Sequence, residues 1–224
     1  MPVLTVVAGP NGSGKSTLTS TLKKAGVTFG EYLNADDIAR SLQGELQEIS
    51  VRAQEIVREK RTDALDQRRD HTFETVMSHP SHIDYMIEAG QAGFEVRLFF
   101  VATEDPVVNL QRVANRVKHG GHDVPKDRIV ARYHRSLGNL PAAIKASNFA
   151  EIFDNSSASR PLRRLAQIKK IEVTNASRTA YLSHREITRR HPRWTLDPSD
   201  IPVWWLDVLL RIKPENPFAD GTLP

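Results

Sequence analysis

Apolar residues in this chain gather in short continuous runs, and these runs alternate with longer segments of helical periodicity. The apolar runs predict strands at 3–8, 31–33, 72–76, 94–102, 149–154 and 168–173. The periodic segments predict helices at 16–25, 45–69, 81–89, 106–117 and 126–138. A further short helix is expected to begin near Asp36, or to have Asp37 as its cap.

The regular alternation of strands and helices continues through residue 154. That order predicts an α/β fold of three layers around a mainly parallel central sheet. We expect residues 1–174 to form this domain and 175–224 to be a C-terminal extension, because the later segment carries six prolines. Trp204 and Trp205 lie there in an apolar patch, 201–212, which is expected to pack back on the core or to meet a partner.

Composition adds limits to this picture. With 224 residues, 39% of them hydrophobic, the chain has enough apolar material for one sizeable core. No run approaches the roughly 18 apolar residues of a membrane span, and no secretory signal is visible. The absence of cysteine fits a cytoplasmic protein, which is our expectation. No cluster of ligands has the spacing of a zinc site.

The net charge of +4 is unevenly distributed. Residues 160–193 hold ten Lys or Arg and two Glu. Such a stretch keeps nucleic acid open as an alternative partner. The lack of regular aromatic residues between the charges favours a solvated surface instead.

The most specific motif follows the first predicted strand. Residues 9–16 match the pattern G-x-x-x-x-G-K-[ST] of a phosphate-binding P-loop, with a strand before it and a helix after it. Glycines let successive backbone N–H groups point inward at phosphate oxygens, and the helix N-terminus adds positive potential. Lys15 is expected to reach the β- and γ-phosphates of ATP, and Ser16 to offer its hydroxyl to Mg²⁺. The residues expected to bind the nucleotide are Gly9, Pro10, Asn11, Gly12, Ser13, Gly14, Lys15, Ser16 and Thr17.

A P-loop does not by itself separate kinases from GTPases or motor ATPases. The guanine-reading motif N-K-x-D is absent, and the short chain suits a small-molecule kinase, in which an acceptor binds across the C-terminal edge of the sheet. A carboxylate at that edge can take the proton of an attacking hydroxyl, and Asp36 is our preferred base. The expected acceptor-binding residues are Asn34, Asp36, Glu74 and Thr75. Three acids, Asp36, Asp105 and Asp154, remain alternatives for supporting Mg²⁺ through water.

Two predicted helices carry arginines on either side of the loop 119–125. Arg112 and Arg116 are expected to lie opposite an apolar face formed by Val107, Leu110, Ala114 and Val117. The next helix has a stripe of Arg128, Arg132 and Arg135. Two helices joined by a glycine loop are typical of a lid, whose arginines can neutralise charge on a transferring phosphoryl group. We expect one or two of these arginines to be functional.

Taken in order, these motifs resemble the zeta toxin family of bacterial toxin–antitoxin systems. The resemblance covers roughly residues 3–155 and rests on AGPNGSGKST (8–17), LNADDIAR (33–40), FETVMS (73–78), RVANRVKHGGHDVP (112–125), RYHRSLGNL (132–140) and EIFDNS (151–156). In the long members of the family a second lid arginine lies near the position of His122. The compact loop here has no clean equivalent of it.

The family's best-known activity is ATP-dependent phosphorylation of UDP-N-acetylglucosamine at a sugar hydroxyl. The resemblance therefore implies Lys15 and Ser16 for ATP and Mg²⁺, Asp36 as the base and Glu74 as a sugar contact. It also implies Arg112 and Arg116 as lid arginines at the γ-phosphate. Toxicity and a cognate antitoxin protein are implied in the same way. A P-loop kinase for another acceptor (an antibiotic, a metabolite or a polynucleotide end) and a non-catalytic nucleotide-binding module are the alternative hypotheses.

Overall fold

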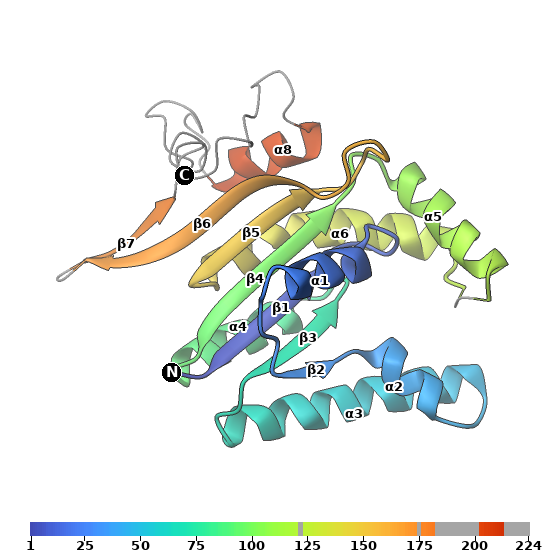
Figure 1. Ribbon diagram of the computed structural model, residues 1–224, viewed down its shortest axis with the longest axis horizontal. Coiled ribbons are helices and arrows are strands. Elements are labelled where there is room, and N and C mark those ends of the chain that lie inside the picture. The colour runs from blue at the N-terminus through green and yellow to red at the C-terminus, as the bar shows by residue number, and fades with distance from the viewer. Residues whose placement is uncertain (121–122, 174–175, 182–201, 213–224) are drawn as a thin grey trace.

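The computed structural model describes residues 1–120, 123–173, 176–181 and 202–212. They form a sheet of seven strands in the order β2-β3-β1-β4-β5-β6-β7 (Figure 1). The strands are β1 (Val3–Ala8), β2 (Glu31–Leu33), β3 (His71–Thr75), β4 (Glu95–Ala102), β5 (Phe149–Asp154), β6 (Arg163–Val173) and β7 (Ala176–Tyr181). The helices are α1 (Lys15–Lys24), α2 (Ala35–Ser41), α3 (Leu46–Asp66), α4 (Ser81–Gln91), α5 (Pro106–Lys118), α6 (Lys126–Lys145) and α8 (Val203–Ile212).

The five strands from β2 to β5 in this order pair in parallel, and β6 and β7 extend the sheet in antiparallel pairing. Parallel neighbours point the same way, so the carboxyl ends of β1, β2, β3, β4 and β5 share one edge of the sheet. This confirms the expected α/β fold with a mainly parallel sheet. It also brings the loops after β1, β2 and β3 together.

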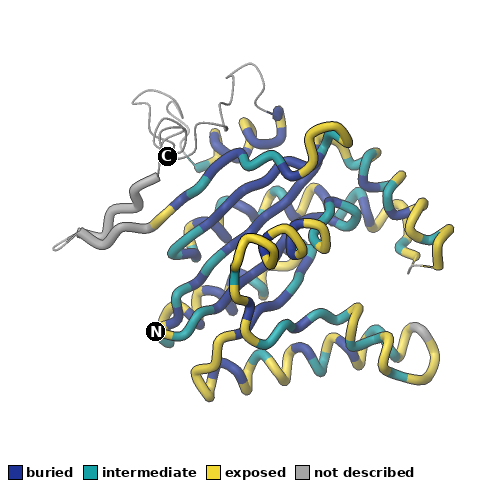
Figure 2. Tube along the Cα trace, viewed as in Figure 1, coloured by how far each residue is buried: buried dark blue, intermediate teal, exposed yellow. Residues whose placement is uncertain are grey.

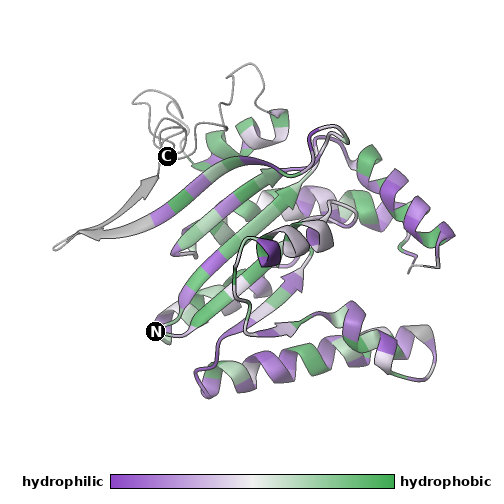
Figure 3. Cartoon of the chain, in the orientation of Figure 1, coloured by the Kyte–Doolittle hydropathy of each residue, from purple (hydrophilic) through white to green (hydrophobic). Residues whose placement is uncertain are grey.

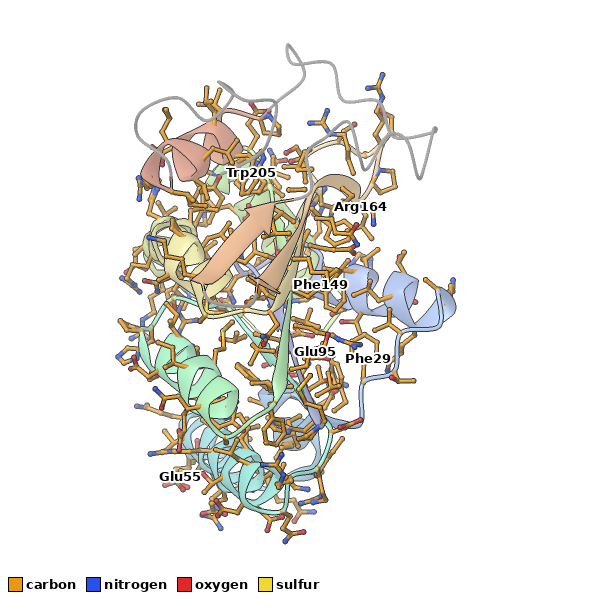
Figure 4. All side chains as sticks on the ribbon, turned by 90° about the vertical axis from the view of Figure 1, so that its left-hand side faces the viewer. Phe29, Glu55, Glu95, Phe149, Arg164 and Trp205 are labelled. Atoms are coloured by element: carbon orange, nitrogen blue, oxygen red, sulfur yellow. The ribbon has the colours of Figure 1, made fainter. Side chains whose placement is uncertain are left out.

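The two faces of the sheet bury separate apolar clusters. On one face, Val7 and Phe99 pack with Leu18 of α1, and Phe29 and Phe149 (labelled in Figure 4) belong to the same side. On the other face a larger cluster joins the strands to α4, α6 and α8. Figure 2 shows the central strands as the most buried part of the molecule, and Figure 3 shows them as its most hydrophobic part. The predicted three layers are therefore confirmed.

Two boundaries differ most from the sequence prediction. α6 continues to Lys145, beyond the expected end at residue 138, although Pro141 lies inside it. Proline removes one helical hydrogen bond, but burial of Leu140, Ala143 and Ile144 against the sheet holds the last turns in place. β6 begins at Arg163 rather than at residue 168, because its pairing with β5 extends back to Asp154.

The start of α2 corrects the predicted cap. Asn34, not Asp37, is the N-cap residue, and its side chain accepts a hydrogen bond of 2.8 Å from the backbone N–H of Asp36. β2 ends at Leu33, so Asn34 is the first polar residue able to take this position. Asp37 lies in the first turn of the helix, where it pairs with Arg40 on the surface.

The described parts of the C-terminal extension are β7, a strand that the sequence pattern did not predict, and helix α8. Trp204 and Trp205 are 5% and 2% exposed, and they belong to the cluster that includes Leu140 of α6 and Ile152 of β5 (Figure 4). The two tryptophans therefore pack back on the core, which was the first of the two roles expected for this apolar patch. The proposed boundary at 174–175 stays a prediction. In the part of the chain that the structure describes, no helix has the length and apolar character needed to cross a membrane.

A cationic side chain is held among aromatic rings where α3 and α4 meet β3. The Arg61 guanidinium lies 4.8 Å from the ring centre of Phe73 and 4.7 Å from that of Tyr85. Its Nη1 lies 3.5 Å from Nδ1 of His82. Burial, and then the charge of Arg61, lower the pKa of His82 to about 4. His82 is therefore neutral in the folded protein at pH 7.

This cluster predicts a loss of stability in mild acid. The unfolded chain binds a proton at His82 near pH 6.5 and the folded chain only near pH 4, so stability falls as pH drops through that window. Between pH 7 and pH 5 we expect His82 to account for about 1–2 kcal/mol of the lost free energy of unfolding. Urea unfolding at both pH values should show a smaller loss for His82→Gln than for the wild type. Equal losses would contradict the assignment.

Candidate active site

The loop after β1 has the backbone shape of a phosphate cradle. Gly12 and Gly14 have φ of 74° and 102°, in the left-handed region that other residues rarely adopt. A Cβ at Gly12 would lie 2.7 Å from the backbone oxygen of Asn109, and one at Gly14 would clash with the side chain of Asn155. The motif needs glycine at both positions for conformation and for space. The loop then enters α1 at Lys15, one residue before the predicted start.

Two buried asparagines brace this loop from outside, and the sequence analysis missed both. Asn109 of α5 donates from Nδ2 to the carbonyl of Asn11 at 2.5 Å, and its Oδ1 accepts from the Thr103 hydroxyl. Asn155, just after β5, donates from Nδ2 to the carbonyl of Ser13 at 2.8 Å. These bonds occupy outward-facing carbonyls and leave the loop preorganised.

Removal of the first brace should loosen the nucleotide site. Asn109→Ala deprives the Asn11 carbonyl of its buried donor, which costs about 1–3 kcal/mol of stability, and we expect ATP affinity to fall about tenfold. Thermal unfolding and calorimetric titration with ATP measure both effects. Asn115→Ala, an exposed position on the same helix, is the matched control. Wild-type ATP affinity in Asn109→Ala would show that the loop holds its shape without the brace.

Lys15 lies across the cradle. Its Nζ donates to the carbonyls of Gly9 at 2.9 Å and Pro10 at 3.2 Å. Burial lowers the pKa of Lys15, the charges of Glu74 and Asp36 oppose this, and those of Arg116 and Arg132 add to it. The Lys15 ammonium is therefore within electrostatic range of two acids, Glu74 and Asp36, and of two arginines, Arg116 and Arg132.

Tyr32, Asp36 and Glu74 form the acidic side of the site. The Tyr32 hydroxyl donates to Oε2 of half-buried Glu74 at 2.8 Å. Asp36 is exposed in the first turn of α2, with no side-chain hydrogen bond or ion pair among the described residues. Of the remaining predicted acceptor residues, Asn34 uses its side chain as the cap of α2. Buried Thr75 accepts a bond of 3.0 Å from the N–H of Met77.

The other two acids considered for magnesium are engaged elsewhere. Asp105 caps α5 by accepting from the N–H of Val107 at 2.7 Å. Asp154 is 4% exposed and accepts from Ser156 at 2.5 Å, while its second oxygen lies 3.5 Å from Arg163. Asp36 and Glu74 are therefore the two acids whose charges act on Lys15.

The most buried residues of α5 are not the apolar residues that its helical spacing groups together. Val107 is 50% exposed and Ala114 is exposed, whereas Asn109 and Val113 are buried. Half-buried Arg112 and exposed Arg116 follow Asn109 on the same side of the helix, at i+3 and i+7. Nη1 of Arg112 is buried without a hydrogen-bond partner among the described residues, so this arginine has a donor to offer.

The three arginines of α6 differ in burial and in their effect on Lys15. Arg132 is half-buried and its charge acts on Lys15, whereas Arg128 and Arg135 are exposed. Burial, and then the charges of those two neighbours, lower the pKa of Arg132. Arg132 is thus the member of its stripe that faces the site. His122 lies outside the described residues.

The donor set at the loop suits Mg²⁺. The hydroxyl-bearing Ser16 is exposed in the first turn of α1, and exposed Asp36 supplies carboxylate oxygens on the acceptor side. Hydroxyl and carboxylate oxygens are hard ligands of the kind that Mg²⁺ binds together with substrate phosphates. Within the described residues, no group of three or more His, Asp or Glu side chains forms a metal site of its own. Ser16 is thus the residue that would hold a nucleotide-borne ion.

The sheet order, the strand–loop–helix cradle and its lysine define a protein of the P-loop kinase fold. The sequence model of the Zeta toxin family matches residues 1–161, and the chain belongs to that family. An uncharacterized protein of Haemophilus influenzae is 31% identical over 130 residues, which are 56% of this chain and 88% of that protein.

Two solved structures share the fold at low identity. The AvrRxo1-ORF1:ORF2 complex with ATP aligns with a TM-score of 0.60 and 16% identity, over 95% of this chain and 76% of that one. The PezAT toxin–antitoxin system of Streptococcus pneumoniae aligns with a TM-score of 0.53 and 16% identity, over 72% of this chain and 70% of that one. At this low identity, the two alignments show that the fold is shared.

Proposed function

We propose that the protein is an ATP-dependent kinase that transfers the γ-phosphoryl group to a hydroxyl of a small acceptor. The observation that carries this proposal is the Lys15 ammonium on the P-loop, which contacts two carbonyls of the loop and is within electrostatic range of Asp36, Glu74, Arg116 and Arg132. A nucleotide switch needs the cradle but not two acids beside it. Zeta toxin membership and the ATP bound in the AvrRxo1 complex support the nucleotide.

In this proposal each residue has one task. Backbone N–H groups within the loop 9–17 bind the phosphates, except at Pro10, which has none, and at Gly9, which donates to Thr75. Lys15 leaves the carbonyls of Gly9 and Pro10 to bind the β- and γ-phosphates. Arg112 and Arg116, with Arg132, neutralise charge on the phosphoryl group. Mg²⁺, held by Ser16 and the nucleotide, supplies further charge neutralisation when bound.

Asp36 orients the acceptor hydroxyl and takes its proton as the new P–O bond forms and the bond to the β-phosphate oxygen breaks. Glu74 and Thr75 then lie on the acceptor side, with Glu74 as a contact for substrate hydroxyls. The phosphoryl transition state is loose, so positioning and charge neutralisation provide most of the rate enhancement.

For the acceptor we propose a nucleotide sugar of the UDP-N-acetylglucosamine type, on the support of the family resemblance. The test is incubation with ATP, Mg²⁺ and a metabolite pool that contains UDP-N-acetylglucosamine, followed by mass spectrometry. The expected result is a gain of one phosphate on that sugar. Phosphate on another metabolite or on a polynucleotide end would keep the kinase and replace the acceptor. Tight ATP binding without transfer to any acceptor would favour the non-catalytic module.

A protein antitoxin is the partner we propose. PezAT is a toxin–antitoxin system, and AvrRxo1-ORF1 forms a complex with ORF2. Expression of the chain alone should arrest growth of a bacterial host, and Lys15→Ala should relieve the arrest. Growth unaffected by the active enzyme would contradict the toxin role while leaving the kinase chemistry to be judged by the transfer assay.

A further inference from the structure

The hydroxyl of Tyr32 lies at a junction between the nucleotide helix and the acceptor side. It donates to Oε2 of Glu74 at 2.8 Å and lies 3.2 Å from the hydroxyl of Thr19, which is one turn beyond Lys15 in α1. The ring is fixed as well. Phe29 contacts it edge-on at 5.8 Å between ring centres, and Nζ of Lys23 lies 5.1 Å above it. Tyr32 is therefore a rigid, half-buried donor aimed at one carboxylate.

That carboxylate has a stronger potential partner nearby. Glu74 exerts the largest favourable charge effect on Lys15, yet no hydrogen bond or ion pair joins the two in the described residues. The Lys15 ammonium instead contacts two neutral carbonyls of its own loop. The two residues belong to adjacent segments, because Gly9, whose carbonyl holds the ammonium, donates its N–H to the carbonyl of Thr75 at 3.2 Å. A charge-assisted bond between Glu74 and Lys15 would be roughly twice as strong as a neutral one. Another contact must therefore keep the Glu74 carboxylate from pairing with Lys15.

We propose that Tyr32 is a positioning residue that keeps the Glu74 carboxylate away from Lys15, so that the ammonium stays available to the nucleotide phosphates. To pair with Lys15, Glu74 would have to give up the bond from a fixed hydroxyl. Lys15 would have to leave both carbonyls as well. Without the Tyr32 hydroxyl, the carboxylate competes with the triphosphate for the same cation. This inference rests on the proposed ATP site.

The test is calorimetric titration with ATP and Mg²⁺, without acceptor, on four variants checked for fold by thermal unfolding. Tyr32→Phe removes only the hydroxyl and should weaken ATP binding about tenfold. Glu74→Gln removes the competing charge and should bind ATP at least as tightly as the wild type. The double variant should bind like Glu74→Gln, because no carboxylate remains to restrain. Tyr85→Phe, whose hydroxyl contacts His71 and the carbonyl of Arg61, is the matched control and should bind like the wild type.

If Glu74→Gln restores ATP binding to Tyr32→Phe, the hydroxyl acts by positioning the carboxylate and not by supporting the local structure. A double variant as weak as Tyr32→Phe would overturn the inference, since the hydroxyl would then act through packing or Thr19. Wild-type affinity in Tyr32→Phe would overturn it as well. A wild-type protein that binds no ATP would overturn the proposed function itself, and the inference with it.

Discussion

Asp36→Ala is expected to abolish phosphoryl transfer while the protein stays folded. Asp36 is exposed, and the cap of α2 uses its backbone N–H rather than its side chain, so truncation leaves the bond to Asn34 in place. Loss of a general base lowers kcat by about 10²–10⁴-fold. Steady-state kinetics with the acceptor identified by mass spectrometry measure the effect, and ATP affinity should change little.

The neighbouring acid provides a close control. Asp37→Ala removes a carboxylate from the same helical turn, where it forms only an exposed ion pair with Arg40, 3.0 Å long. Such pairs contribute little to stability. We expect this variant to retain kcat within about twofold, since the change lies outside the reacting groups. If Asp36→Ala were fully active, Asp37 or proton transfer assisted by the substrate would become the candidate base.

Lys15→Ala should be the most damaging single substitution. It removes the cation that the β- and γ-phosphates require, and we expect kcat/KM to fall by at least about 10³-fold. Folding should survive, because the lost bonds are two contacts from Nζ to carbonyls of the same loop. The assay is transfer from ATP at saturating acceptor, together with thermal unfolding.

Lys24→Ala serves as the control for charge, since Lys24 is exposed at the end of the same helix. Activity near wild type in Lys24→Ala and none in Lys15→Ala would assign the effect to the loop lysine. Comparable activity in both variants would mean that the loop does not bind the phosphates.

The sequence predicted the parts of this site that depend on local chemistry. Gly12, Gly14 and Lys15 belong to a contiguous motif, and the apolar runs before Gly9 and around Phe73 place that motif and Glu74 at the ends of neighbouring strands. Each of these signals is complete within a few residues. The fold class and the P-loop could therefore be predicted directly.

The missed features depend on contacts between distant segments. Asn109 contacts Asn11 across 98 positions, and Asn155 contacts Ser13 across 142. An asparagine in a helix or after a strand gives no sign of such a partner. Polarity is also a poor guide to burial in α5, where apolar Val107 is 50% exposed and polar Asn109 is fully buried. The one signal for Asn109 was its helical spacing, which places it on the same side of the helix as Arg112 and Arg116.

The most direct test of the account is a crystal structure with a non-hydrolysable ATP analogue and Mg²⁺. The account predicts a triphosphate in the loop 9–17, Nζ of Lys15 moved from the carbonyls of Gly9 and Pro10 to the β- and γ-phosphates, and Asp36 facing the γ-phosphate. A loop still closed by Lys15, with the analogue bound elsewhere or not at all, would contradict it.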